Sequence, residues 1–210
     1  MAKPVIYVLA GVNGAGKSSI GGHLLTRAGL AWFNPDEFAR AFRENTLCSQ
    51  TDANATAWGE GVRRLETAMQ RKQSFAFETT LGGNSIPAKL LAATKTHDVI
   101  IWFCGLSSAE QHIARVKERV KAGGHDIPEE KIRERCTTAL GNLIALMPEL
   151  SQLYVYDNSV TVQQGQSVPN PTLLLAMENG RLRWPTAMED FRKTPDWAKP
   201  LLEAALEQEA

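Results

Sequence analysis

Short apolar runs alternate with helix-like patterns along most of the chain. The runs are rich in β-branched and aromatic residues, which is typical of strands buried in a parallel sheet. The predicted strands are Val5–Ala10, Leu30–Phe33, Phe75–Phe77, Asp98–Cys104 and Tyr154–Tyr156, and the predicted helices are Ser18–Ala28, a helix beginning near Pro35, Ala53–Lys72, Ile86–Thr96, Ser107–Ala122 and a helix beginning at Pro128. This alternation predicts an α/β fold: a mostly parallel sheet of five to six strands with helices on both faces.

The C-terminal quarter has a different pattern. A polar stretch over 163–171 separates it from the rest and is expected to form a loop. Leu173–Met177 and Arg181–Trp184 flank Asn179-Gly180, the favoured pair for a tight hairpin turn, so we predict a β-hairpin. The tail from Pro195 onward predicts a helix, because its leucines fall on one helix face.

Composition restricts the class of protein. The chain has 210 residues, with 23 basic and 23 acidic side chains, so a general nucleic-acid-binding surface is not expected. Three widely spaced cysteines lack the spacing of a zinc site and predict free thiols in a reducing cytoplasm. The first apolar run stops at a glycine-rich loop, so it predicts neither a signal peptide nor a membrane span.

The first strand leads into Gly11–Ser18, which matches the phosphate-binding loop G-x-x-x-x-G-K-[ST]. Its glycines let successive N–H groups face phosphate oxygens, and the following helix presents its positive end to the same anion. Lys17 is then expected to reach the β- and γ-phosphates of ATP, and the Ser18 hydroxyl to bind Mg²⁺. The predicted nucleotide-binding residues here are Gly11, Asn13, Gly14, Ala15, Gly16, Lys17, Ser18 and Ser19.

Two carboxylates and a basic hairpin indicate which class of nucleotide-binding protein this is. Asp36 follows the second predicted strand and Glu78 the third, and parallel strands place such residues at one edge of the sheet. The base-reading Asn-Lys-x-Asp run of GTPases is absent. The two helices around Gly123-Gly124 carry Arg115, Lys117, Arg119, Lys121, Lys131, Arg133 and Arg135. This layout is typical of small kinases, whose lid arginines neutralise the transferring phosphoryl group.

These motifs together resemble the zeta toxin family, the kinases of bacterial toxin–antitoxin systems. The resemblance covers roughly Val5 to Ser159 and rests on Gly11–Ser18, Asn34-x-Asp36-x-Phe38-x-Arg40, Glu78-x-Thr80, the stretch from Arg115 to Pro128, Ile132-x-x-Arg135 and Tyr156–Ser159. It implies ATP- and Mg²⁺-dependent phosphorylation of a hydroxyl of a UDP-activated amino sugar such as UDP-N-acetylglucosamine. It also implies an antitoxin protein as a partner.

The same resemblance assigns roles to single residues. It implies that Lys17 and Ser18 bind phosphate and metal, Asp36 is the catalytic base, Glu78 and Thr80 hold the acceptor, and Arg119 and Arg135 clamp the phosphates. The Gly-Gly-His-x-Ile-Pro lid is similar to that of the shorter chromosomal members, so Arg115 or Arg133 could take the place of Arg119. Asp157 and Asn158 follow the last strand of the core, where related kinases keep the adenine, although a simple turn is an equal alternative.

We therefore expect a single P-loop kinase domain over 1–210, with a core over 4–160, a lid over approximately 107–140 and a C-terminal hairpin and helix over 172–208. Two alternatives stay open. The acceptor could be another small hydroxyl compound, such as an antibiotic or a nucleoside, or the chain could be a non-catalytic nucleotide-binding switch. Asp36 favours an enzyme, because a switch needs no base after that strand. Asp36 could also be only a favourable acid in the first turn of a helix.

Overall fold

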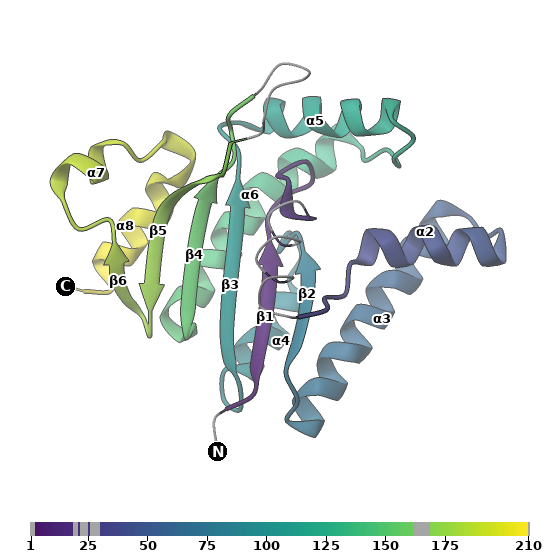
Figure 1. The fold of residues 1–210 in the computed structure, drawn as a ribbon, viewed down its shortest axis with the longest axis horizontal. Coiled ribbons are helices and arrows are strands. Elements are labelled where there is room, and N and C mark those ends of the chain that lie inside the picture. The colour runs from purple at the N-terminus through teal and green to yellow at the C-terminus, as the bar shows by residue number, and fades with distance from the viewer. Residues whose placement is uncertain (1–2, 19–20, 22–24, 26–29, 162–168, 210) are drawn as a thin grey trace.

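A six-stranded sheet runs through the molecule in the order β2-β1-β3-β4-β5-β6 (Figure 1). The computed structural model describes residues 3–18, 21, 25, 30–161 and 169–209. The strands are β1 Val5–Ala10, β2 Phe75–Thr79, β3 Asp98–Gly105, β4 Gln152–Asp157, β5 Thr172–Glu178 and β6 Arg181–Trp184. The first four are parallel to one another, β5 is antiparallel to β4, and β6 is antiparallel to β5. This mostly parallel sheet confirms the predicted α/β fold.

β1 is an interior strand, next to the edge strand β2, and is hydrogen-bonded to β2 on one side and β3 on the other. Its Ile6 and Val8 side chains are fully buried. A parallel strand that is covered on both faces consists of a continuous run of apolar residues, and that run is the pattern from which β1 was predicted. The C-terminal end of β1 therefore delivers the glycine-rich loop to the sheet edge between β2 and β3.

The described helices are α2 Pro35–Thr46, α3 Gln50–Arg71, α4 Ser85–Ala93, α5 Ala109–Lys121, α6 Glu129–Leu146, α7 Met188–Arg192 and α8 Lys199–Glu207, with short 3₁₀ turns η1 Met147–Glu149 and η2 Asp196–Ala198. α4, α6 and α8 pack side by side on one face of the sheet, whereas α2 and α3 extend beyond its β2 edge (Figure 1). Among the residues with described positions, no helix is both long and apolar enough to cross a membrane.

Side-chain caps fix where the helices α2 and α5 begin. The Asn34 side chain accepts the backbone N–H groups of Asp36 and Glu37, and Pro35 occupies the first helical turn of α2, as predicted. The predicted capping box at Ser107 was wrong by one residue. Ser108 caps α5 by accepting the Gln111 N–H, because Ser108 is the residue whose extended backbone aims its hydroxyl at the helix end.

The predicted strand at Leu30–Phe33 was also wrong. Only Phe33 pairs with the sheet, through one parallel bridge to Phe77. The chain enters α2 at the next turn, since Asn34 and Pro35 form a strong helix start, so no length remains for a strand. The predicted helix over 18–28 lies largely outside the described residues, although Gly21 and Leu25 are helical.

The C-terminal hairpin is confirmed and extends the sheet. Asn179 and Gly180 both have positive φ, of 50° and 73°, as a type I′ turn requires. The predicted tail helix begins at Lys199 after the 3₁₀ turn η2, and α7 was not predicted. Leu201, in α8, is only 1% exposed. The hairpin and tail therefore belong to the same hydrophobic core as β1.

Candidate active site

The glycine-rich loop after β1 is shaped by contacts that exclude side chains. Gly14 and Gly16 both have a φ of 83°. A Cβ atom at Gly14 would lie 2.7 Å from the His112 carbonyl oxygen, and one at Gly16 would lie 2.4 Å from Asn158 Nδ2. Only glycine fits either position, so the loop can curl with its N–H groups free to face an anion.

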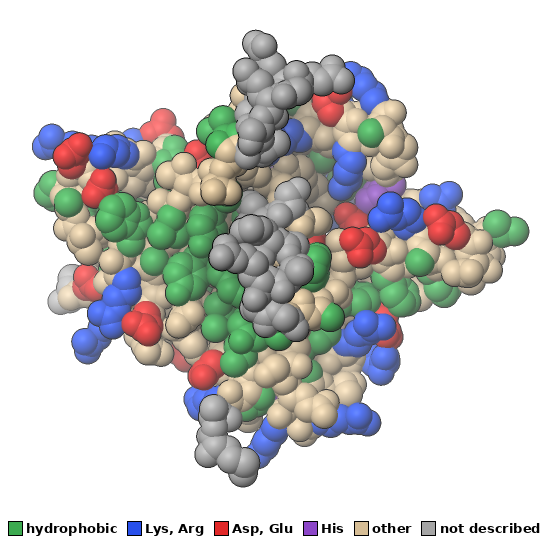
Figure 2. Space-filling view, viewed as in Figure 1, with side chains coloured by type: hydrophobic (Ala, Val, Ile, Leu, Met, Phe, Trp, Pro, Cys, Tyr) green, Lys and Arg blue, Asp and Glu red, His purple; other side chains and the backbone are tan. Residues whose placement is uncertain are grey.

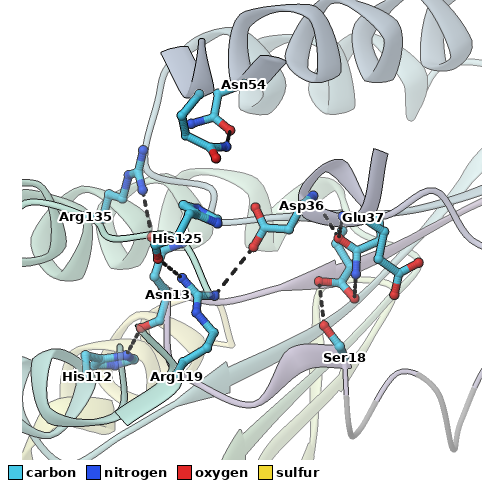
Figure 3. Close-up of polar contacts among 12 residues, drawn as sticks. Asn13, Ser18, Asp36, Glu37, Asn54, His112, Arg119, His125 and Arg135 are labelled. Carbon is cyan, nitrogen blue, oxygen red and sulfur yellow. Dashed lines mark hydrogen bonds and ion pairs between the residues drawn. The ribbon is translucent and has the colours of Figure 1, made fainter. Parts of the chain in front are cut away.

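Three side chains from distant elements hold this loop in place. His112 Nδ1 donates to the Asn13 carbonyl oxygen at 2.8 Å, and Arg135 Nη1 donates to Asn13 Oδ1 at 2.7 Å (Figure 3). Asn158 Nδ2 donates to the Ala15 carbonyl oxygen at 2.8 Å. The loop is therefore tied to α5, to α6 and to the end of β4 before any nucleotide binds.

Asp36 lies on the opposite side of the cleft, in the first turn of α2. Arg119 from α5 approaches it, with Arg119 Nη1 3.6 Å from Asp36 Oδ2 (Figure 3). Arg119 Nη2 also donates to the His125 carbonyl oxygen at 3.3 Å. The Asp36 side chain is 52% exposed, so its carboxylate can meet a ligand from solvent.

Glu78, at the end of β2, is the buried carboxylate of the site. It is 6% exposed and accepts hydrogen bonds from Trp32 Nε1 at 3.1 Å and Ser18 Oγ at 3.3 Å. Burial raises the pKa of the Glu78 carboxyl, although the Lys17 charge opposes that shift. Burial lowers the pKa of the Lys17 ammonium, and the charges of Glu78 and Asp36 oppose that shift. The lysine therefore sits in a field of negative charge that a bound phosphate would reinforce.

A cavity of about 580 Å³ joins these groups. The sheet edge, α3 and the segment before α6 form its walls, with Phe33, Trp58 and Val62 on the apolar side. Its polar lining is Asn13, Lys17, Asn34, Asp36, Thr51, Asn54, Glu78, Thr79, Thr80, His125, Asp126, Lys131 and Arg135. This is the volume of a typical small-molecule site, so we call it the acceptor cavity.

The structure brings together most of the residues that the sequence singled out. Lys17, Asp36, Glu78, Thr80 and Arg135 all line the acceptor cavity. The Thr80 hydroxyl accepts the Gly82 N–H at 3.3 Å, so it also shapes its own turn.

The two alternative arginines of the hairpin, Arg115 and Arg133, lie elsewhere. Arg133 forms an ion pair with Glu110 at 2.6 Å on the surface. Arg115 Nη2 donates to the carbonyl oxygens of Asn158 and Val160. Arg119 and Arg135 are thus the arginines of the hairpin that reach the cleft. Ser19, a predicted nucleotide-binding residue directly after the phosphate-binding loop motif, lies outside the described residues.

Sequence reasoning missed several residues that support the site. His112 was passed over because no ligand spacing marks it, and Trp32 because an aromatic residue is most simply core. Trp197 donates through Nε1 to Asp157 Oδ1 at 3.3 Å from far along the chain. None of these contacts has a local signal, since each joins residues more than 35 positions apart.

The donor set fits Mg²⁺ bound together with a nucleotide. The Ser18 hydroxyl and the Glu78 carboxylate are hard oxygen donors 3.3 Å apart. Mg²⁺ in kinases is held by one or two such groups plus substrate phosphates. Within the described part of the chain, no group of three or more His, Cys, Asp or Glu side chains could hold a metal ion alone.

Comparison with known proteins gives one family and several similar folds. The model of the zeta toxin family matches residues 1–168. An uncharacterized protein of Haemophilus influenzae is 28% identical over 140 residues, which cover 63% of this chain and 91% of that protein.

Two solved structures share the fold at low identity. A chain of the AvrRxo1-ORF1:-ORF2 complex with ATP matches with a TM-score of 0.62 and 13% identity, covering 97% of this chain. This chain spans only 64% of that longer one. A chain from the PezAT chromosomal toxin–antitoxin system of Streptococcus pneumoniae matches with a TM-score of 0.55 and 11% identity, covering 99% of this chain and 86% of that chain.

The family match covers most of the chain. It contains the phosphate-binding loop, the Asp36 carboxylate and the basic hairpin whose Arg119 and Arg135 reach the cleft. The chain belongs to the zeta toxin family.

Proposed function

We propose that this phosphotransferase uses Mg²⁺ and ATP to phosphorylate a hydroxyl group of a UDP-activated amino sugar, with UDP-N-acetylglucosamine as the leading candidate. The observation that carries the proposal is the position of Asp36. Its half-exposed carboxylate faces a cavity of about 580 Å³ that Lys17 also lines, and Arg119 of the hairpin lies 3.6 Å away. A base, a phosphate-binding lysine and a lid arginine thus converge where an acceptor would sit.

The reaction follows from that arrangement. The acceptor oxygen forms a bond to the γ-phosphorus of ATP while the bond from that phosphorus to the β,γ-bridging oxygen breaks, and ADP leaves. Asp36 takes the hydroxyl proton as the oxygen attacks. Lys17, Arg119 and Arg135 offset the charge that spreads over the transferring group.

Ser18 and Glu78 would hold the Mg²⁺ ion, which neutralises charge on the β- and γ-phosphates. Glu78 also holds the N-terminus of α2 through Asn34, whose Nδ2 lies 3.4 Å from Glu78 Oε1. The same asparagine accepts the Asp36 N–H. In this proposal Glu78 links the metal site to the position of the base.

The hairpin of α5 and α6 acts as a lid in this proposal. Arg135 reaches Asn13 of the phosphate loop from α6, and Arg119 reaches Asp36 from α5. Both arginines therefore lie at the mouth of the cleft, where a small movement would carry them to phosphate oxygens. An antitoxin protein that binds over this cleft belongs to the same proposal, since the PezAT relative comes from a toxin–antitoxin system.

The test is Asp36→Asn. The substitution keeps the size of the side chain and the N-terminal turn of α2 but removes the base. We expect transfer to UDP-N-acetylglucosamine to fall by ~10²–10⁴-fold while ATP binding stays near wild type. The measurement is steady-state transfer from labelled ATP, with ATP affinity titrated separately.

Glu37→Gln is the matched control, because Glu37 is the next residue, is exposed and does not line the acceptor cavity. It should retain wild-type transfer. Unchanged turnover in Asp36→Asn would remove Asp36 from the role of base. A wild-type protein that binds ATP and modifies no UDP-sugar would instead overturn the acceptor.

A further inference from the structure

A second cavity lies beside the acceptor cavity, between α2 and the tip of the hairpin. It has a volume of about 360 Å³ and is lined by Asp36, Arg40, Arg43, Gln50, Arg119, Ala122, Gly123, Gly124 and His125. We call it the basic pocket. Asp36 and His125 line both cavities, so the two spaces meet at the proposed base.

The arginines of the basic pocket come from two facing elements. Asp36, Arg40 and Arg43 are spaced i, i+4 and i+7, so they project from one face of α2. At 1.5 Å per residue, Arg40 lies about 6 Å and Arg43 about 10 Å along the helix from Asp36. Arg119 faces them from α5. Arg43 Nη1 donates to Gln50 Oε1 at 2.7 Å, which holds that guanidinium toward the start of α3.

Positive charge in this pocket is not balanced by the protein. Three guanidinium groups line it and Asp36 is its one lining carboxylate. Over the described residues, neither Arg40 nor Arg43 takes part in an ion pair, and Arg119 Nε is buried without a hydrogen-bond partner. By contrast, the surface arginines at 63, 64, 133 and 183 each face a carboxylate within 3.2 Å. Figure 2 shows blue side chains beside a purple histidine in the notch between α5 and α2.

We propose that the basic pocket binds the diphosphate of the acceptor, with Arg40 and Arg43 as the residues that select an anionic nucleotide sugar. This inference rests on the proposed kinase function and deepens it. In the proposed function the phosphate loop binds the phosphates of ATP. No residue of 11–18 lines the basic pocket, so the pocket is available for a different anion. An acceptor hydroxyl at Asp36 would place a diphosphate on the same sugar ring within reach of Arg40 and Arg43. Planar guanidinium groups bind such oxygens in pairs.

The alternative acceptors differ in charge. A neutral sugar, an uncharged nucleoside or a cationic antibiotic would leave two arginines facing an empty pocket or repelled by the ligand. The basic pocket therefore favours an acceptor with at least two negative charges near its reacting hydroxyl.

The experiment compares the double variant Arg40→Gln/Arg43→Gln with wild type. Glutamine keeps a long polar side chain and similar helix propensity, and both positions are exposed, so folding should persist. We expect the KM for UDP-N-acetylglucosamine to rise at least about 10-fold, the scale of losing one charge-assisted contact, with the KM for ATP unchanged. The rise should be smaller for N-acetylglucosamine 1-phosphate and absent for neutral N-acetylglucosamine.

Arg71→Gln is the control, since Arg71 is an exposed arginine at the end of α3, outside both cavities. Equal increases in the KM for charged and neutral acceptors would overturn the proposal, as would a rise in the KM for ATP of the same size. Thermal unfolding of each variant checks that the fold is kept.

A second measurement separates this proposal from the identity of the acceptor. Inorganic pyrophosphate is titrated into protein saturated with a non-hydrolysable ATP analogue, so that the phosphate loop is occupied. The expected result is binding that weakens at least about 10-fold in the double variant and not in Arg71→Gln. If no UDP-sugar is phosphorylated but this difference appears, the proposed acceptor fails and the pocket stands. Identical pyrophosphate binding in all three proteins overturns the pocket.

Discussion

At the scale of single residues, His112 shows how a buried side chain can set the geometry of the phosphate loop. It is 4% exposed, and its Nδ1–H donates to the Asn13 carbonyl oxygen. Burial lowers the pKa of His112 from 6.5 to about 4, and the charge of Lys17 adds to that shift. His112 is therefore neutral in the folded protein at neutral pH, and its protonation would place a second positive charge behind the loop.

This environment predicts a pH dependence of stability. The folded state binds the proton with a pKa of about 4, whereas the unfolded chain binds it near 6.5. The unfolded state therefore gains stability as pH falls from about 6.5 to about 4, and the free energy of unfolding should drop by on the order of 3 kcal/mol over that window from this group. His112→Gln, which can still donate to the carbonyl, should lose that part of the slope.

Chemical denaturation at several pH values measures this effect. His125→Gln serves as the control, because it removes a partly buried imidazole at the hairpin tip and leaves His112 in place, so the part of the slope that comes from His112 should persist. A His112→Gln slope equal to that of wild type between pH 6.5 and 4 would contradict the assignment.

At the scale of elements, η2 reaches back from the C-terminal segment to the ends of β3 and β4, beside the phosphate loop. The Trp197 ring covers Gly105, where a Cβ atom would lie 2.2 Å from the ring. Its Nε1 donates to Asp157 Oδ1, and the next residue, Asn158, donates to the Ala15 carbonyl oxygen. A segment beyond residue 168, where the family match ends, thus supports the nucleotide side of the cleft.

Trp197→Phe should weaken this support without removing the packed ring. Losing one hydrogen bond to a carboxylate costs about 1.5–3 kcal/mol at the bond itself, and Asn158 passes on only part of that loss to the loop. We therefore expect the KM for ATP to rise about 5-fold with little change in kcat. Trp184→Phe is the control, because Trp184 is 36% exposed and lies on β6, the edge strand separated from β1 by β3, β4 and β5. Equal KM values for ATP in both variants would show that Trp197 has only a packing role.

At the scale of the whole molecule, the C-terminal hairpin and α8 share one hydrophobic core with β1. The side chains of Leu175 on β5 and Leu201 on α8 are each at most 2% exposed. α8 also packs on α6, the helix that carries Arg135. We therefore expect the tail and the catalytic core to unfold together.

Two leucines of α8 provide a matched pair for that expectation. Leu201→Ala should lower the free energy of unfolding by ~2–5 kcal/mol in a single transition, since Leu201 is 1% exposed. Leu206→Ala should change it by less than ~0.5 kcal/mol, since Leu206 is 42% exposed. Denaturation followed by fluorescence and by circular dichroism distinguishes the outcomes. Two separate transitions in wild type or in Leu201→Ala would mean that the tail is an independent unit.

The sequence by itself determined the features that depend on local chemistry. The apolar run of β1, the glycines of the loop and the Asn179-Gly180 turn each specify a backbone conformation within a few residues. Glu78 could be placed at the sheet edge because parallel strands align their carboxyl ends. Asp36 lies at the same edge, although the strand predicted before it is only a single bridge at Phe33. Errors occurred where two local signals competed, as at Phe33, where the helix start of α2 left room for a single bridge.

Only the tertiary structure decided how distant residues complete the site. The contacts of Asn13 with His112 and Arg135, and of Ala15 with Asn158, span 99, 122 and 143 positions. No periodicity or propensity encodes such pairs, because they result from strand order and from the packing of α5 and α6 over the sheet edge. The choice of Arg119 and Arg135 over the other lid arginines, and the basic pocket at Arg40 and Arg43, follow from that packing alone.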